Sequence, residues 1–147
     1  MEVDGVTVRL LHDLEDIRTS WPLMQQLRPN QSDEGSYVRQ VESQQQNTGY
    51  NLVGIFHSDG RLIALAGFVC SEMLSRGSYL YVDDLVVDEG HRSQGIGRIL
   101  ISWLRTHARD LGCSSLHLDC SNHRVDSHRF YRHEGLEQRS LHFVLDL

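Results

Sequence analysis

The spacing of apolar and polar residues predicts short strands alternating with amphipathic helices. Alternating or continuous runs of aliphatic and aromatic residues indicate strands, and apolar residues at intervals of three and four indicate helices that face a core. The predicted strands are residues 6–11, 51–57, 62–73, 79–87, 115–119 and 138–147. The predicted helices are one that follows Asp13 and three more at 33–46, 94–111 and 126–134.

Turn and cap residues divide these elements. Asp13 is a helix N-cap, Pro22 marks a restart or kink, and residues 28–32 break the helical pattern. Gly112 and Gly135 follow helices at the position where a left-handed residue ends them. The resulting order is β-α-α-β-β-β-α-β-α-β, an antiparallel meander followed by a βαβ unit. This predicts one mixed α/β (α+β) domain over residues 1–147, with strand 115–119 parallel to strand 79–87.

Composition excludes several classes of function. The net charge is −6, and the arginines are scattered, so nucleic acid is not an expected partner. The three cysteines form no CxxC pair, and the histidine spacing suits no metal site, so we expect no metal. The longest apolar run, 62–70, is too short to cross a bilayer, and no signal peptide opens the chain. We therefore expect a cytoplasmic protein without a membrane partner.

The segment 85–98 carries the strongest chemical signal. A β-branched strand enters a short polar loop, and the loop opens a long amphipathic helix. The first turn of a helix has unpaired N–H groups and a partial positive charge, so it attracts anions such as a pyrophosphate. Gly95 and Gly97 allow close approach of a ligand to the backbone, and Arg92 and Arg98 could add donors. The segment is neither a P-loop nor a Rossmann fingerprint, and a glycine-rich helix start without a ligand is the alternative.

Residues 92–97, Arg-Ser-Gln-Gly-Ile-Gly, resemble the R/Q-x-x-G-x-G/A motif of the GNAT superfamily of acetyltransferases. Residues 127–136 resemble the second signature of that family, a helix carrying F-Y-x-x-x-G-F/L. The resemblance covers about Tyr79 to Leu136. It implies a mixed, mostly antiparallel sheet of six to seven strands with a central splayed parallel pair, flanked by about four helices.

The same resemblance implies acetyl-CoA as cosubstrate and assigns residues to it. The loop amides would hold the pyrophosphate, and the preceding strand would pair with pantetheine. The implied cofactor-binding residues are Leu85, Val86, Val87, Arg92, Ser93, Gln94, Gly95, Ile96, Gly97, Arg98, Ser127, Phe130 and Tyr131. Tyr131 would be the general acid toward the departing thiolate. Where many family members have Asn seven residues before this tyrosine, the chain has Arg124.

Amide formation needs a neutral amine, so a base is required. Four carboxylates are candidates, in the order Asp83, Asp119, Asp84 and Glu34. Strand alternation sends Asp83 and Asp84 to opposite faces unless a bulge intervenes. Asp83 and Asp119 match in position the bases of polyamine-acetylating and ribosomal-protein-acetylating relatives. Cys120 is interpreted as a small apolar residue, not as a nucleophile.

These observations predict an N-acetyltransferase that moves an acetyl group from acetyl-CoA to a primary amine by direct attack, without a covalent enzyme intermediate. The alternative is a non-catalytic acyl-CoA-binding regulatory module. The acceptor, a small molecule or a peptide, stays open. Pairing of the final strand, 138–147, between subunits would give a homodimer.

Overall fold

The computed structural model describes residues 1–31 and 33–147; Ser32, at the end of the predicted break, lies outside the described residues. The chain divides into two compact units, Met1–His117 and Leu118–Leu147, and each is described by itself. Strand β6, Ser115–Leu118, crosses the boundary, since its last residue, Leu118, is the first of the second unit.

The N-terminal unit is built on a sheet whose strands follow one another in chain order, from β1 to β6. The strands preceding β6 are β1 (Glu2–Val3), β2 (Val6–Leu11), β3 (Asn51–Phe56), β4 (Leu62–Met73) and β5 (Gly77–Val87). Each of these pairs antiparallel with its neighbour. The exception is the last pair, in which β6 runs parallel to β5. The start of β6 is held to the start of β5, because the Ser114 amide donates to the Ser78 carbonyl at 2.8 Å.

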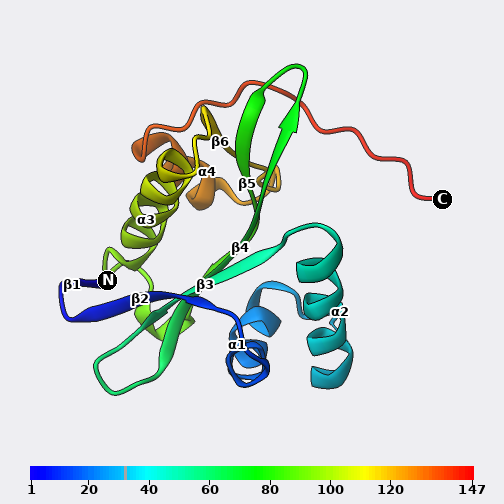
Figure 1. Cartoon of the computed structure of the whole chain (residues 1–147). Helices are drawn as coiled ribbons and strands as arrows, with labels where there is room; N and C mark the ends of the chain where they lie inside the picture. The colour runs from blue at the N-terminus through cyan, green and yellow to red at the C-terminus, as the bar shows by residue number, and fades with distance from the viewer. Residues whose placement is uncertain (32) are drawn as a thin grey trace. The chain divides into compact units, whose positions relative to one another are not determined.

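Helices cover both faces of this sheet. The helices of the N-terminal unit are α1 (Leu14–Leu27), α2 (Glu34–Asn47), the short 3-10 helix η1 (Glu89–His91) and α3 (Ile96–Asp110). Helices α1 and α2 lie next to each other (Figure 1) and share a core with Leu52, Leu65 and Val86 of the sheet. On the other face, Phe68 of β4 meets Trp103 and His107 of α3 edge-on.

The predicted capping residues have their expected roles. The Asp13 and Asp33 side chains accept from the amides of Asp16 and Ser36 at the starts of α1 and α2. Helix α1 continues through Pro22 as one element, where the sequence predicts a restart or a kink. Helix α3 begins at Ile96 instead of Gln94, since Gly95 has a left-handed φ of 80° that is not helical.

The C-terminal unit contains helix α4, Val125–His133, followed by an extended segment. Gly135 has φ 92°, and the Leu136 amide donates to the Tyr131 carbonyl at 2.9 Å, which closes the helix as the glycine predicts. The prediction of a strand at 138–147 is wrong for the single chain. A strand needs a neighbour for its amides and carbonyls, and residues 138–147 pair with none of the described strands.

Candidate functional site

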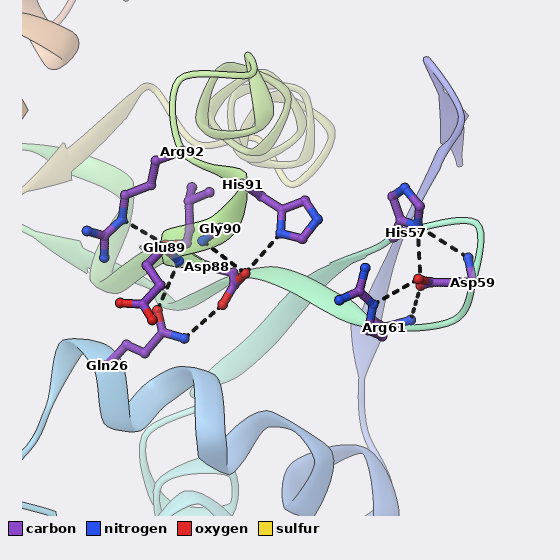
Figure 2. Close-up of polar contacts among 10 residues, drawn as sticks. Gln26, His57, Asp59, Arg61, Asp88, Glu89, Gly90, His91 and Arg92 are labelled. Carbon is purple, nitrogen blue, oxygen red and sulfur yellow. Dashed lines mark hydrogen bonds and ion pairs between the residues drawn. The ribbon is translucent and has the colours of Figure 1, made fainter.

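The turn after β5 is fastened by the Asp88 carboxylate (Figure 2). One oxygen accepts from Gln26 Nε2 at 2.8 Å, and the other lies 2.9 Å from His91 Nδ1 and 3.3 Å from the Gly90 amide. The hydrogen bond from Gln26, followed by the one with His91, holds the pKa of Asp88 below its ordinary value. The Glu89 amide also donates to Gln26 Oε1, so α1 fixes the first residues of the turn.

The second half of this turn leaves the start of α3 open. Ser93 and Gly95 both have positive φ, 63° and 80°. Within the described part of the chain, no side chain caps α3 at Gly95, and the first intrahelical bond runs from the Ile99 amide to the Gly95 carbonyl. The amides of the first turn therefore have no partner within the helix. Left-handed residues interspersed in a turn direct successive N–H groups to one side, an arrangement that binds anions.

Among the other predicted residues of this segment, some have buried side chains and others are exposed. The Ile96 and Val86 side chains are buried, and Val86 belongs to the core beneath α1 and α2, so only their backbones are available to a ligand. Gln94 and Arg98 are exposed at the helix start. Arg92 differs from the expectation of a phosphate donor in one respect, because its Nε donates to the Val87 carbonyl at 3.2 Å (Figure 2).

A β-bulge separates the two aspartates of β5. Gly67 of β4 pairs with Asp84, and the next residue, Phe68, pairs with Val82. Asp83 is therefore the extra residue of the bulge and has no partner across the ladder. The sequence allowed for such a bulge but did not place it.

The bulge gives the two carboxylates different surroundings. Asp84 accepts from the Tyr50 hydroxyl at 2.6 Å and from Arg28 Nε at 3.0 Å. Arg28 also donates to the backbone carbonyl of Asp83, at 2.9 Å. No hydrogen bond from a described residue reaches the Asp83 carboxylate, which leaves that group available for another partner.

The pKa of Asp83 is raised above its ordinary value of 3.8. Partial desolvation is the main cause, the charge of Asp84 adds to it, and Arg28 opposes both. The residue as a whole is nevertheless solvent-exposed. A solvent-accessible carboxylate with a raised pKa is suited to take up a proton.

Tyr50 reaches Asp84 through the space left by a glycine. A Cβ at Gly67 would collide with the Tyr50 hydroxyl and ring, so only glycine fits at this position. The buried Tyr37 hydroxyl lies nearby in the same core and is hydrogen-bonded to Ser20 at 2.7 Å. Desolvation raises the pKa of Tyr37 to about 12 and that of Tyr50 well above its usual value, so both phenols stay neutral. No motif marks these residues in the sequence, so their hydrogen bonds could not be predicted from it.

The remaining candidates lie in other places. Glu34 is exposed at the first turn of α2. Asp119, in the C-terminal unit, is also exposed, and its carboxylate lies 3.4 Å from His142 Nδ1.

Tyr131 lies on α4 of the C-terminal unit beside Phe130, with ring centroids 5.3 Å apart. Desolvation, together with the charge of Cys120, raises its pKa to about 12, and Arg124 opposes the shift. Cys120 is hydrogen-bonded to Ser127, and its own pKa is raised, chiefly by desolvation. A thiol with a raised pKa is a poor nucleophile, which agrees with the sequence interpretation of Cys120.

A family model, that of the acetyltransferase (GNAT) family, matches residues 11–135. The chain belongs to the GNAT acetyltransferase family. The matched residues include β5, the open start of α3 and helix α4. The family that the two short motifs indicate is therefore confirmed.

Individual relatives agree with this family. The GNAT chain is 29% identical over 126 residues to the uncharacterized N-acetyltransferase YhdJ of Bacillus subtilis, a match covering 86% of this chain and 87% of the relative. It is 27% identical over 86 residues to glucosamine 6-phosphate N-acetyltransferase of Arabidopsis thaliana, covering 57% and 56%. Its fold matches that of a Trypanosoma brucei acetyltransferase with a TM-score of 0.80 at 24% identity, covering 97% and 99% of the two chains.

Within residues 1–31 and 33–147, no cluster of three or more His, Cys, Asp or Glu side chains is arranged to hold a metal ion. Across the same residues, no helix combines the length and the apolar character needed to span a membrane.

Proposed function

We propose that this GNAT chain is an N-acetyltransferase that transfers an acetyl group from acetyl-CoA to a primary amine by direct attack. The observation that carries the proposal is the open start of α3 after β5, with its uncapped first turn and the left-handed residues Ser93 and Gly95. Family membership indicates what the site is for, and the anion-binding geometry fits a pyrophosphate.

The residues present fit the cosubstrate. Amides at positions 93–98 would bind the pyrophosphate, with Arg98 as an exposed cation at the helix start. The end of β5, at Leu85, Val86 and Val87, would supply backbone groups to the pantetheine arm. Arg92, an exposed residue, would help by holding the end of the strand through its bond to the Val87 carbonyl. Acetyl-CoA itself would supply the activated thioester.

Asp83 is the base that the geometry favours. An alkylamine with a pKa of about 10.4 is mostly protonated at neutral pH, so a proton must leave it before attack. Asp84 is engaged by Tyr50 and Arg28, and Asp119 is exposed in the other unit. Asp83 has a raised pKa and a carboxylate without a described hydrogen-bond donor. It would take the proton directly or through a water molecule.

Tyr131 is proposed as the donor to the leaving thiolate. With a pKa of about 12 its hydroxyl stays protonated at neutral pH and can donate a hydrogen bond. A thiol has a pKa of about 8.5, so complete transfer of the proton to the thiolate would be uphill. Tyr131 would therefore act mainly by stabilising the thiolate through this hydrogen bond.

The acceptor class is a primary amine. The Arabidopsis relative carries the name of an enzyme acting on glucosamine 6-phosphate, an amino sugar. The carboxylate of Asp83 would instead favour a cationic amine, since no hydrogen bond from a described residue reaches it and its charge is not matched by a bound side chain as that of Asp84 is. A panel of acceptors should therefore include glucosamine 6-phosphate, a polyamine, an aminoglycoside and a lysine-containing peptide.

The first test is thermal unfolding with acetyl-CoA, coenzyme A and ATP side by side. A ligand at about 100 times its dissociation constant stabilises a protein by about 2.7 kcal/mol, a rise of about 5–10 °C for a chain of this size. We expect the rise with both coenzyme A species and none with ATP. No rise with either coenzyme A species would refute the phosphate site.

Gly95→Ala and Gly112→Ala form a matched pair of variants for this site. Both glycines have left-handed φ, 80° and 78°, and a Cβ at either meets no atom within 4 Å. Both substitutions should therefore cost about 1–2 kcal/mol of stability for the same reason. Only Gly95→Ala should weaken coenzyme A binding, by about tenfold or more, because Gly112 lies at the opposite end of α3.

The release of coenzyme A thiol from acetyl-CoA, measured with each amine of the panel, then distinguishes an enzyme from a non-catalytic binding module. Amine-dependent thiol release supports the acetyltransferase. Binding of acetyl-CoA without thiol release for any amine would favour the non-catalytic acyl-CoA-binding module instead.

A further inference from the structure

Two cysteines meet within the N-terminal unit. The Cys70 and Cys113 thiols are hydrogen-bonded to each other, although strand β5 and helix α3 separate them along the chain. Both residues are partly buried, and neither is part of a disulfide. The pair lies outside both family motifs and has no role in the proposed acetyl transfer, so the contact between the two thiols needs an explanation of its own.

The fold explains why the two thiols meet. Cys70 is two residues after Phe68 on β4, so both side chains lie on the same face of the sheet. On this face Phe68 contacts His107, in the last turn of α3. Cys113 follows the end of that helix, where its amide donates to the Ala108 carbonyl at 2.9 Å. The end of α3 therefore places Cys113 over the face of β4 that carries Cys70.

The residue after Cys113 fixes this position independently of the thiols. The Ser114 amide donates to the Ser78 carbonyl of β5 at 2.8 Å, and the Ser114 hydroxyl donates to the same carbonyl at 3.0 Å. Ser78 pairs in turn with Glu72 of β4, two residues beyond Cys70. Backbone contacts thus hold the connection between α3 and β6 close to the part of β4 where Cys70 lies.

We propose that Cys70 and Cys113 are a redox-active pair that forms a reversible disulfide. The hydrogen bond already holds the two sulfurs in contact, and they have only to approach each other to the bond length of about 2.05 Å. The disulfide would join β4 to the connection between α3 and β6. It would close a loop over residues 70–113, which contains the open start of α3. The proposal does not depend on the acetyltransferase activity.

The reaction uses a low-molecular-weight disulfide as its oxidant. Burial, followed by the charge of Cys113, raises the pKa of the Cys70 thiol, so Cys70 keeps its proton and Cys113 reacts first. The Cys113 thiolate attacks one sulfur of the oxidant and forms a mixed disulfide, and the thiolate that leaves takes up a proton. Cys70 then loses its proton and attacks the Cys113 sulfur, which releases the second small thiol. Two protein thiols are thereby oxidised, and one small disulfide is reduced to two thiols.

Cys120 provides the matched control. It is also partly buried, but it lies in the C-terminal unit and is hydrogen-bonded to Ser127 instead of to a thiol. The unaltered chain and the variants Cys70→Ser, Cys113→Ser and Cys120→Ser are each equilibrated, at low micromolar concentration, with an excess of oxidised glutathione. Free thiols are then blocked with N-ethylmaleimide, and intact mass spectrometry counts the blocked thiols and any bound glutathione.

The number of blocked thiols decides whether the two cysteines pair. In the unaltered chain we expect one blocked thiol after oxidation and three after reduction with dithiothreitol. Cys120→Ser should leave none after oxidation, because its two remaining thiols pair. Cys70→Ser and Cys113→Ser should form no internal disulfide. An internal disulfide in either of these two variants, or an unaltered chain that keeps all its thiols free or bound to glutathione, would overturn the proposal.

Thermal unfolding of the Cys120→Ser chain tests whether the disulfide fits the native fold. The oxidised form should melt about 5–15 °C above the reduced form, because the cross-link restricts the unfolded chain. Addition of dithiothreitol should reverse the rise. An unchanged or lower melting temperature after oxidation would show that the bond forms only at the expense of the native structure, and would overturn the proposal.

Discussion

Tyr50→Phe tests whether the arrangement of the two β5 carboxylates depends on one buried phenol. The substitution removes only the hydroxyl that donates to Asp84 at 2.6 Å, and the ring, which is 3% exposed, stays in place. A hydrogen bond to a charged group contributes about 1.5–3 kcal/mol. We expect unfolding to become easier by that amount, which lowers the melting temperature by about 5–10 °C.

Tyr37→Phe is the matched control. Tyr37 is 3% exposed and belongs to the same core, but its hydroxyl pairs with the neutral Ser20. A neutral pair contributes about 0.5–1.5 kcal/mol, so this variant should be less destabilised than Tyr50→Phe.

A double-mutant cycle of Tyr50→Phe with Asp84→Asn, followed by thermal and denaturant unfolding, isolates the coupling between the two groups. We expect a coupling energy of about 1–2 kcal/mol. A cycle with no coupling, or equal effects of the two tyrosine variants, would show that Asp84 does not depend on Tyr50.

Two predictions concern the chemistry. Asp83→Asn should lower acetyl transfer most at low pH, where the least amine is neutral. It should also stabilise the fold at neutral pH: a folded-state pKa above 3.8 means that ionised Asp83 destabilises the native state. That gain in stability should vanish as the pH falls below 3.8. Unfolding measured as a function of pH checks the stability, and the pH profile of the rate checks the transfer. A rate loss with Asp119→Asn instead would reassign the base. Tyr131→Phe should lower turnover by about 10²–10³-fold and leave acetyl-CoA affinity nearly unchanged, as measured by single-turnover kinetics and ligand-dependent melting; unchanged turnover would remove Tyr131 from the reaction.

Most of the fold could be predicted because the spacing of apolar residues and the cap residues mark each helix and strand within its own segment. The run at 62–73 matches β4 at both ends, and the apolar stripe predicted over 94–111 gives α3 to within two residues at its start. One further local signal, for the hairpin that adds β1, is absent from the prediction. Asp4 and Gly5, both with positive φ, form a two-residue hairpin turn that pairs β1 with β2, and Asp-Gly is typical of that turn.

The C-terminal segment shows where local signals fail. Alternation at 138–147 predicts a strand, but a strand exists only where another strand accepts and donates its hydrogen bonds. The sequence specifies the face of the segment and not its partner.

The candidate site also has a part that local sequence predicts and a part that depends on distant contacts. The open start of α3 depends on residues that follow one another in the chain, and a glycine-containing loop before a helix indicates it directly. The choice between Asp83 and Asp84 depends on contacts across more than thirty positions, from Tyr50 and Arg28 to β5. No spacing rule connects those residues, so the sequence could rank the carboxylates but could not show that one of them is engaged.

The bulge links the sheet to the proposed chemistry. In an unbroken ladder every residue of β5 would have a partner on β4, and the two carboxylates would point to opposite faces. Gly67 pairs with Asp84 and leaves room for the Tyr50 ring, which places a donor on that carboxylate. Asp83, displaced from the ladder, then has a raised pKa with no described donor to its carboxylate. A single extra residue in one strand thus separates a carboxylate held by Tyr50 and Arg28 from the one proposed as the base, and residues outside both family motifs make that separation.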